Sequence, residues 1–141
     1  MLRTGPLKGE NMRKFYILIV LGLAFCSVSC SRKETASDPA YHLITAEEAA
    51  AMMEKEAAYI IVDVRRPDEF AEGHIPGAVN IPNEEIGSER PSELPDPDMV
   101  LLVYCRTGRR SRQAAEKLLS LGYTRVYDFG GILSWKGEVE R

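Results

Sequence analysis

The chain has 141 residues and a formal net charge of −3 at pH 7, a length that allows one domain of ordinary size. From Cys30 onward, 14 Lys and Arg residues stand against 20 Asp and Glu residues, a net charge near −6. So acidic a domain provides no extended basic face, and the composition therefore argues against nucleic acid as a partner.

Residues 1–29 are predicted to be an export signal. Arg13 and Lys14 form a positively charged region, and residues 15–26 that follow are uncharged and apolar. This run is shorter than the roughly twenty apolar residues that a transmembrane helix needs, although an uncleaved anchor remains the alternative. The polar stretch before Met12 adds nothing to the signal, so Met12 is an equally good start of the chain.

The segment that ends this signal, Ser27-Val28-Ser29-Cys30, resembles the cleavage box of bacterial lipoproteins, in which the cysteine becomes the lipidated N-terminus. A leucine is usual where Ser27 stands, and an ordinary small-x-small cleavage site fits the same residues. The resemblance implies lipid on Cys30 and a polar linker over residues 30–40, which would hold the domain at a membrane surface. We therefore expect an exported protein of the bacterial periplasm or cell surface.

Residues 41–141 are predicted to form the globular domain. Thr45 and Glu48 have the spacing of a capping box, which predicts a helix from this point to about Glu56. A second helix is expected over residues 111–121, where apolar residues recur at helical spacing.

Four short apolar runs predict buried strands, at residues 59–63, 78–81, 99–104 and 125–127. Gly122 separates the last of these runs from the preceding helix, and the four prolines of residues 82–97 predict a surface loop. Unbroken apolar strands that alternate with helices are typical of a sheet covered on both faces. We therefore expect an α/β fold with a central, mainly parallel sheet and helices on both sides.

A thiol lies where one predicted strand ends and a helix begins. Cys105 follows residues 99–104, and four arginines crowd the same turn: Arg106, Arg109, Arg110 and Arg112. The start of a helix favours negative charge, so this site should hold Cys105 as a thiolate and attract an anion. Once Cys26 leaves with the signal and Cys30 is lipidated, Cys105 is the one thiol left, and no intramolecular disulfide is possible.

Four segments resemble the single-domain rhodaneses, a family of sulfurtransferases. They are residues 63–70 (DVRRPDEF), 73–82 (GHIPGAVNIP), 105–111 (CRTGRRS) and 130–135 (GGILSW). Together they extend over about residues 41–137, which is nearly the whole predicted domain. The resemblance implies a rhodanese-like fold and a cysteine that accepts a sulfane sulfur and passes it on.

On this resemblance, Cys105 is the catalytic nucleophile. Its thiolate would attack the outer sulfur of a small anionic donor such as thiosulfate, and a thiol or protein acceptor would remove the sulfur from the resulting persulfide. No metal or cofactor is needed. The backbone N–H groups of the active-site loop can surround the sulfur as a nest for negative charge. The residues of this loop are Arg106, Thr107, Gly108, Arg109 and Arg110.

Loop length separates the nearest alternatives. Phosphatases of similar architecture place an arginine after five intervening residues, which makes a cradle wide enough for a phosphate group. Here Arg110 follows four intervening residues and Ser111 stands at the phosphatase spacing. This favours sulfur transfer over phosphatase or arsenate-reductase chemistry. A sulfur-carrier or interaction module without efficient turnover is a second hypothesis.

Three further polar residues have weaker assignments. Asp63 follows a predicted strand as Cys105 does, so the two should share one rim of the sheet. Asp63 could orient the loop and Arg65 could line its entrance, or both could belong to a structural ion pair near the strand end. His74 is expected to be a hydrogen-bonded structural residue rather than a catalytic base.

Overall fold

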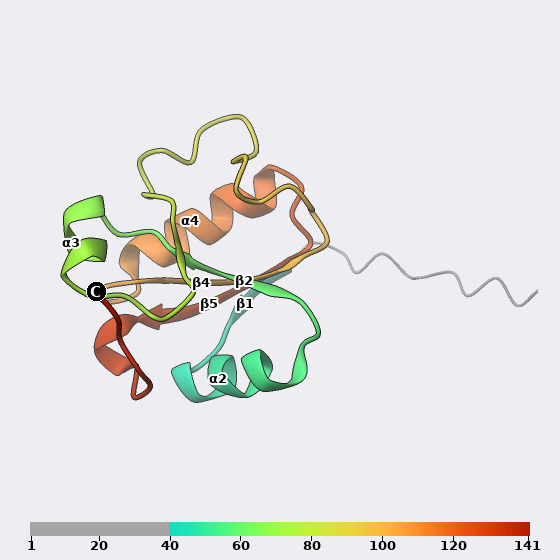
Figure 1. The fold of residues 1–141 in the computed structure, drawn as a ribbon. Helices are drawn as coiled ribbons and strands as arrows, with labels where there is room; N and C mark the ends of the chain where they lie inside the picture. Colours follow the sequence, from blue (N-terminus) through green and yellow to red (C-terminus); the bar gives the residue numbers. More distant parts are fainter. Residues whose placement is uncertain (1–39) are drawn as a thin grey trace, which may run out of the picture. The chain divides into compact units, whose positions relative to one another are not determined.

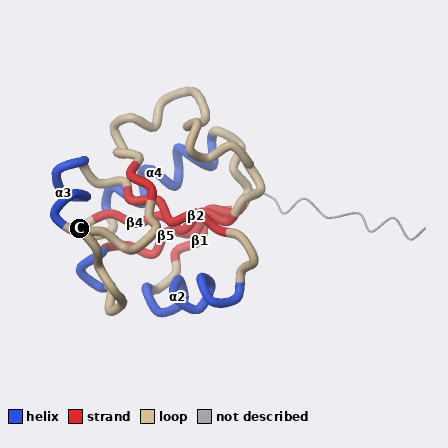
Figure 2. The backbone as a smooth tube through the Cα atoms, in the orientation of Figure 1, coloured by secondary structure: helices blue, strands red, loops and turns tan. Residues whose placement is uncertain are grey.

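The computed structural model describes residues 40–141, which form a five-stranded sheet with helices on both faces (Figure 1). Every strand pairing in this sheet is parallel, and the order across the sheet is β1-β5-β4-β2-β3. Figure 2 shows the strands in red between helices in blue. The strands are β1 (Ala40–Leu43), β2 (Tyr59–Asp63), β3 (Val79–Asn80), β4 (Val100–Cys105) and β5 (Arg125–Gly131). The α/β fold that the sequence predicts is thereby confirmed.

The helices lie on opposite sides of this sheet. They are α2 (Ala46–Lys55), α3 (Pro67–Glu72), α4 (Arg109–Ser120) and the 3₁₀ turn η1 (Ile132–Ser134). Figure 1 shows α2 on one face and α4 on the other, so the central strands are buried on both sides. None of the helices in this part of the chain is long and apolar enough to cross a membrane. The expected export signal and Cys30 lie outside the described residues.

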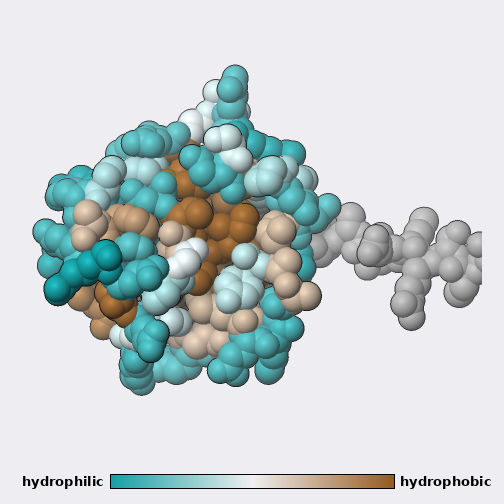
Figure 3. Space-filling model, in the orientation of Figure 1, coloured by the Kyte–Doolittle hydropathy of each residue, from teal (hydrophilic) through white to brown (hydrophobic). Residues whose placement is uncertain are grey.

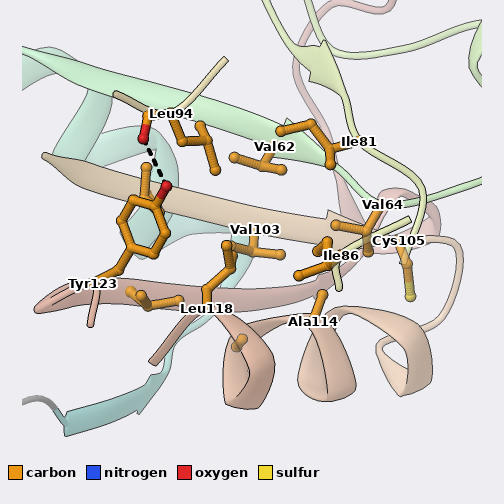
Figure 4. Packing of buried hydrophobic residues seen from close by; sticks show 13 residues of the cluster. Val62, Val64, Ile81, Ile86, Leu94, Val103, Cys105, Ala114, Leu118 and Tyr123 are labelled. Carbon is orange, nitrogen blue, oxygen red and sulfur yellow. Dashed lines mark hydrogen bonds between the residues drawn. The ribbon is translucent and has the colours of Figure 1, made fainter. Parts of the chain in front are cut away.

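Alternate residues of β4 contribute to two hydrophobic cores. Leu101, Val103 and Cys105 belong to the core that also contains Ala114 and Leu118 of α4 (Figure 4). The other core packs on α2 and contains the residues of β4 that point to the opposite face of the sheet: Val100, Leu102 and Tyr104. Because side chains alternate along a strand, residues two positions apart point to the same face of the sheet. The thiol of Cys105 therefore lies on the α4 side, as Val103 does.

The molecular surface is mostly hydrophilic on the face drawn in Figure 3. Apolar side chains gather near the middle of this face, between α2 and the long loop that precedes β4. That loop contains no helix or strand from residue 82 to residue 97, as its four prolines predict.

The predicted helices agree with the structure to within two residues at their ends. The capping box is present, because the N–H of Glu48 donates to Thr45 Oγ1 at 3.1 Å and the N–H of Thr45 donates to Glu48 Oε2 at 2.7 Å. Helix α4 begins at Arg109, two residues before its predicted start. The cause is Gly108, whose positive φ of 103° turns the chain from the strand directly into the helix.

Three elements, β1, α3 and η1, were not predicted from the apolar pattern, and two strands differ in length. Strand β1 is only four residues long, and helix α3 has six residues with no buried side chain, so neither carries a readable hydrophobic period. Strand β3 keeps only two of the four predicted residues. Strand β5 continues past the prediction because its pairing with β4 extends to Gly131 opposite Cys105.

Candidate active site

Cys105 is the last residue of β4 and lies directly before the loop that leads into α4. Its side chain is buried, with 1% of the residue exposed. A cavity of about 420 Å³ opens beside the loop. Its lining comes from the loop, α3 and the segment after β3: Arg66, Glu69, Glu84, Arg106, Thr107, Arg109 and Arg110. The cavity thus lies at the carboxyl ends of the parallel strands, where the sequence predicts a ligand site.

The loop directs backbone N–H groups at the thiol. The N–H of Gly108 donates to Cys105 Sγ at 3.1 Å. Burial raises the pKa of the Cys105 thiol, but hydrogen bonds from the N–H groups of Ser111, Gly108 and Thr107 outweigh it, so that the pKa lies below its ordinary 9.0. Of the predicted nest over residues 106–110, the Gly108 N–H is the group that donates to the sulfur within hydrogen-bond distance, and it favours the thiolate.

The Ser111 hydroxyl also lies beside this thiol and lowers its pKa as well. The same hydroxyl is within 3.0 Å of the Gly108 carbonyl oxygen and 3.1 Å of the Gly130 carbonyl oxygen. A hydroxyl has one proton, which these two carbonyls engage, so we attribute the stabilisation of the thiolate to the backbone N–H groups. Ser111 then acts by joining the loop to β5.

The two glycines that end β5 form the support on which the loop lies. A Cβ atom on Gly131 would stand 2.3 Å from the carbonyl oxygen of Arg106, and one on Gly108 would stand 3.5 Å from Gly130 Cα. The loop therefore packs backbone against backbone on β5. The sequence signal for this close approach is the pair of consecutive glycines in residues 130–135.

The arginines of the loop have different partners. Arg110 forms a bidentate ion pair with Glu69 of α3, with nitrogen–oxygen distances of 2.6 and 2.9 Å. Arg106 and Arg109 form no ion pair with any residue of 40–141 and line the cavity. Arg66 also lines it, although its guanidinium contacts the exposed Asp68. The attraction for an anion therefore comes mainly from side chains other than Arg110.

The Glu69–Arg110 pair makes the acid stability of the protein testable. The hydrogen bonds from Arg110 lower the pKa of Glu69 from its ordinary 4.5 to about 2. Because the folded pKa lies below the unfolded one, the pair stabilises the fold above pH 4.5, and that contribution is lost as the pH falls toward 2. We expect Glu69→Gln to lower the free energy of unfolding at pH 7 by about 1 to 3 kcal/mol, with a smaller further loss on acidification than wild type shows.

Urea unfolding at pH 7 and pH 3 checks this expectation. The control is Glu72→Gln on the same helix, where the side chain is exposed and forms no ion pair within residues 40–141. An equal loss of stability between the two pH values in wild type and Glu69→Gln would contradict the assignment.

Asp63 and Arg65 are not part of the loop. Four hydrogen bonds of 2.6 to 3.0 Å reach the Asp63 carboxylate from Arg65, and within residues 40–141 none reaches it from residues 106–110. The Asp63 side chain is fully buried and that of Arg65 is 7% exposed. Of the roles that the sequence left open, the structure shows the structural ion pair; a role for Asp63 in orienting the loop and for Arg65 at its entrance is not seen.

His74 is a structural residue, as expected. Its Nδ1 lies 3.0 Å from the carbonyl oxygen of Phe70, and its ring stacks on Phe70 with centroids 3.7 Å apart. Its backbone pairs with Glu140 in an isolated antiparallel bridge, which fixes the C-terminal segment.

The sequence analysis did not assign the partners that hold the loop in place. Glu69 lies 41 residues from Arg110, and Asp128 accepts the N–H of Gly130 in the part of β5 that lies against the loop. The available signal for Glu69 was its place in the family-like segment 63–70, although its ion-pair partner could not be identified from sequence. Within residues 40–141 there is no group of three or more His, Cys, Asp or Glu residues that could hold a metal ion.

Fold and site together define a class of protein: a parallel α/β domain that holds a cysteine of lowered pKa in an arginine-rich loop at the carboxyl edge of its sheet. The Rhodanese-like domain family matches residues 45–138, and the chain belongs to this family.

Three similar proteins agree with this assignment. The chain is 41% identical over 71 residues to the thiosulfate sulfurtransferase PspE of Escherichia coli (strain K12), which covers 50% of this chain and 68% of that protein. It is 44% identical over 77 residues to a sulfurtransferase of Allochromatium vinosum, with coverage of 54% and 70%. The solved structure of a rhodanese with anions from E. coli superposes with a TM-score of 0.55 at 38% identity, covering 60% of this chain and 99% of that one.

Proposed function

We propose that the protein is a sulfurtransferase that carries a sulfane sulfur from an anionic donor such as thiosulfate to a thiophilic acceptor through a persulfide on Cys105. The observation that carries the proposal is the thiol itself, whose sulfur accepts the Gly108 N–H at 3.1 Å and whose pKa is lowered. The cavity beside the loop is lined by Arg106 and Arg109, which form no ion pair with any residue of 40–141. Family membership and the names of the similar proteins support it.

The reaction has two steps. The Cys105 thiolate attacks the outer sulfur of thiosulfate, a sulfur–sulfur bond forms, and the original one breaks with its electron pair leaving on sulfite. The outer sulfur then carries the negative charge, which the loop N–H groups are placed to stabilise. A thiolate or cyanide acceptor next attacks that sulfur, and the Cys105 thiolate leaves. Such covalent catalysis predicts ping-pong kinetics.

Intact-mass measurement after incubation of the purified chain with thiosulfate tests the proposal. Wild type should gain the mass of one sulfur atom, and Cys105→Ala should not. The full chain has three cysteines, so the adduct is also mapped to its peptide. If wild type gains no sulfur on Cys105, the proposal fails. Efficient loading without release to cyanide or small thiols would instead favour a dedicated sulfur carrier.

We also propose that the protein is exported and held at a membrane by lipid on Cys30. The proposal is supported by the charged and apolar pattern of residues 13–26 and by the lipoprotein-like box that ends at Cys30. Labelling cells with radioactive palmitate should mark wild type and not Cys30→Ala. Absence of label in wild type would remove the lipid anchor.

A further inference from the structure

We propose that Asp128 is a positioning residue that holds the Cys105 loop in its reactive geometry. It acts through the irregular end of β5 at Gly130, where the pairing with β4 shifts register and the backbone turns at a positive φ of 82°. This inference rests on the proposed function only in taking Cys105 as the reacting thiol. Asp128 lies on β5 opposite Val103, two residues before Cys105 on the neighbouring strand.

Both oxygens of the Asp128 carboxylate are engaged in the interior. The residue is 1% exposed. Its Oδ1 accepts the N–H of Gly130 at 2.9 Å, and its Oδ2 accepts the hydroxyl of Tyr41 at 2.9 Å. A buried carboxylate is costly unless its oxygens are hydrogen-bonded, so these two contacts fix the side chain and, with it, the turn.

From the turn, contacts lead directly to the thiol. The Gly130 carbonyl oxygen accepts the Ser111 hydroxyl at 3.1 Å, and the same hydroxyl lies 3.0 Å from the Gly108 carbonyl oxygen. Gly108 packs against Gly130 and donates its own N–H to Cys105 Sγ at 3.1 Å. Movement of the Gly130 turn therefore moves the groups that stabilise the thiolate.

Tyr41 completes the arrangement from the edge strand β1. Burial, followed by its hydrogen bond to Asp128, raises the pKa of Tyr41 to about 12, so the hydroxyl remains a proton donor throughout the neutral range. Arg112 and Glu116 of α4, which form an exposed ion pair, are the other charged groups that act on it. Strand β1 thus contributes to the site although it supplies none of the residues lining the cavity.

The test measures alkylation of Cys105 by iodoacetamide in the full chain across a range of pH, followed on the Cys105 peptide. Asp128→Ala removes the acceptor of the Gly130 N–H, and we expect the midpoint of the pH profile to rise by about one unit, which is roughly a tenfold lower rate near neutral pH. Asp128→Asn keeps an acceptor for that N–H and should restore a profile close to wild type.

A matched control separates positioning from general destabilisation. Tyr123→Phe removes a buried hydrogen bond of 2.6 Å to the Leu94 carbonyl oxygen, at the end of the core remote from Cys105 (Figure 4). It should lower the melting temperature and leave the alkylation profile unchanged. If Asp128→Ala does not fold, Tyr41→Phe takes its place, since it removes one contact of Asp128 at a partly exposed residue and should shift the profile in the same direction.

An unchanged profile in Asp128→Ala, or in Tyr41→Phe if the first variant does not fold, overturns the inference; an equal shift in Tyr123→Phe does so too. Alkylation requires no sulfur donor. A shifted profile in a protein whose wild type forms no persulfide would therefore reject the proposed function and retain the positioning role.

Discussion

Replacing Gly131 with alanine is expected to abolish sulfur loading of Cys105. The new Cβ atom would stand 2.3 Å from the Arg106 carbonyl oxygen and 2.7 Å from Thr107 Cα, and both are backbone atoms that cannot rotate away. The loop and β5 must therefore separate, which carries the N–H groups away from the thiol. A displacement of about 1 Å at a reacting centre can cost roughly a hundredfold in rate, and we expect at least that loss.

The rate of adduct formation with thiosulfate, followed by intact mass on protein shown to be folded by circular dichroism, measures this effect. Gly77→Ala is the matched control, because Gly77 has a positive φ of 76° but no heavy atom within 4 Å of an added Cβ. It should cost about 1 to 2 kcal/mol of backbone strain and leave loading unchanged. Wild-type loading in Gly131→Ala would show that the close packing of loop and strand is dispensable.

Asp63→Ala should cause the largest loss of stability, about 3 to 5 kcal/mol in the free energy of unfolding. Its removal leaves the Arg65 guanidinium, 7% exposed, without its carboxylate, and leaves the Arg65 N–H without its acceptor. After removal of Asp63 the guanidinium keeps its hydrogen bond to the Gly73 carbonyl oxygen and its position 5.7 Å from the centroid of the Tyr104 ring, but neither contact supplies a negative charge. A buried unpaired charge is far more costly than loss of the pair itself.

A double-mutant cycle with Arg65→Met measures that difference by urea unfolding. The double variant should be markedly more stable than the sum of the two single losses implies, because it buries no unpaired charge. The comparison cycle uses Arg112 and Glu116, whose side chains are 69% and 61% exposed and whose coupling should be about 0.3 to 0.5 kcal/mol. Additive losses at Asp63 and Arg65 would contradict the assignment of a coupled buried pair.

The fold could be predicted from the sequence where buried elements show a recognisable order of apolar residues. Strand β4 is buried on both faces over all six residues, so it reads as an unbroken apolar run. The capping box before α2 is equally local, because its two partners are three residues apart. Strand β1 could not be predicted this way, since its place at the sheet edge requires little apolar sequence.

Only the part of the candidate site formed by residues close to Cys105 in the sequence could be predicted. The loop and its N–H groups follow from a cysteine between a strand and a helix. The ion pair of Arg110 with Glu69 and the contact of Asp128 with Tyr41 join residues 41 and 87 positions apart. Such pairings are set by strand order, and the sequence contains many other carboxylates that could have served. For the same reason, the choice between the two roles of Asp63 required the observed distances.

Different atoms of the candidate site stabilise the thiolate and attract an anion. Backbone N–H groups stabilise the sulfur of Cys105, whereas the side chains of Arg66, Arg106 and Arg109 line the cavity that would receive the donor under the proposed function. A side-chain substitution leaves the backbone donors in place, so these arginines can diverge during evolution and change which anion is accepted without altering the thiol's chemistry. Gly131, which packs against the loop, cannot be replaced by a larger residue without displacing the loop backbone. We therefore expect the preference for a donor anion to change more readily during evolution than the sulfur-transfer reaction.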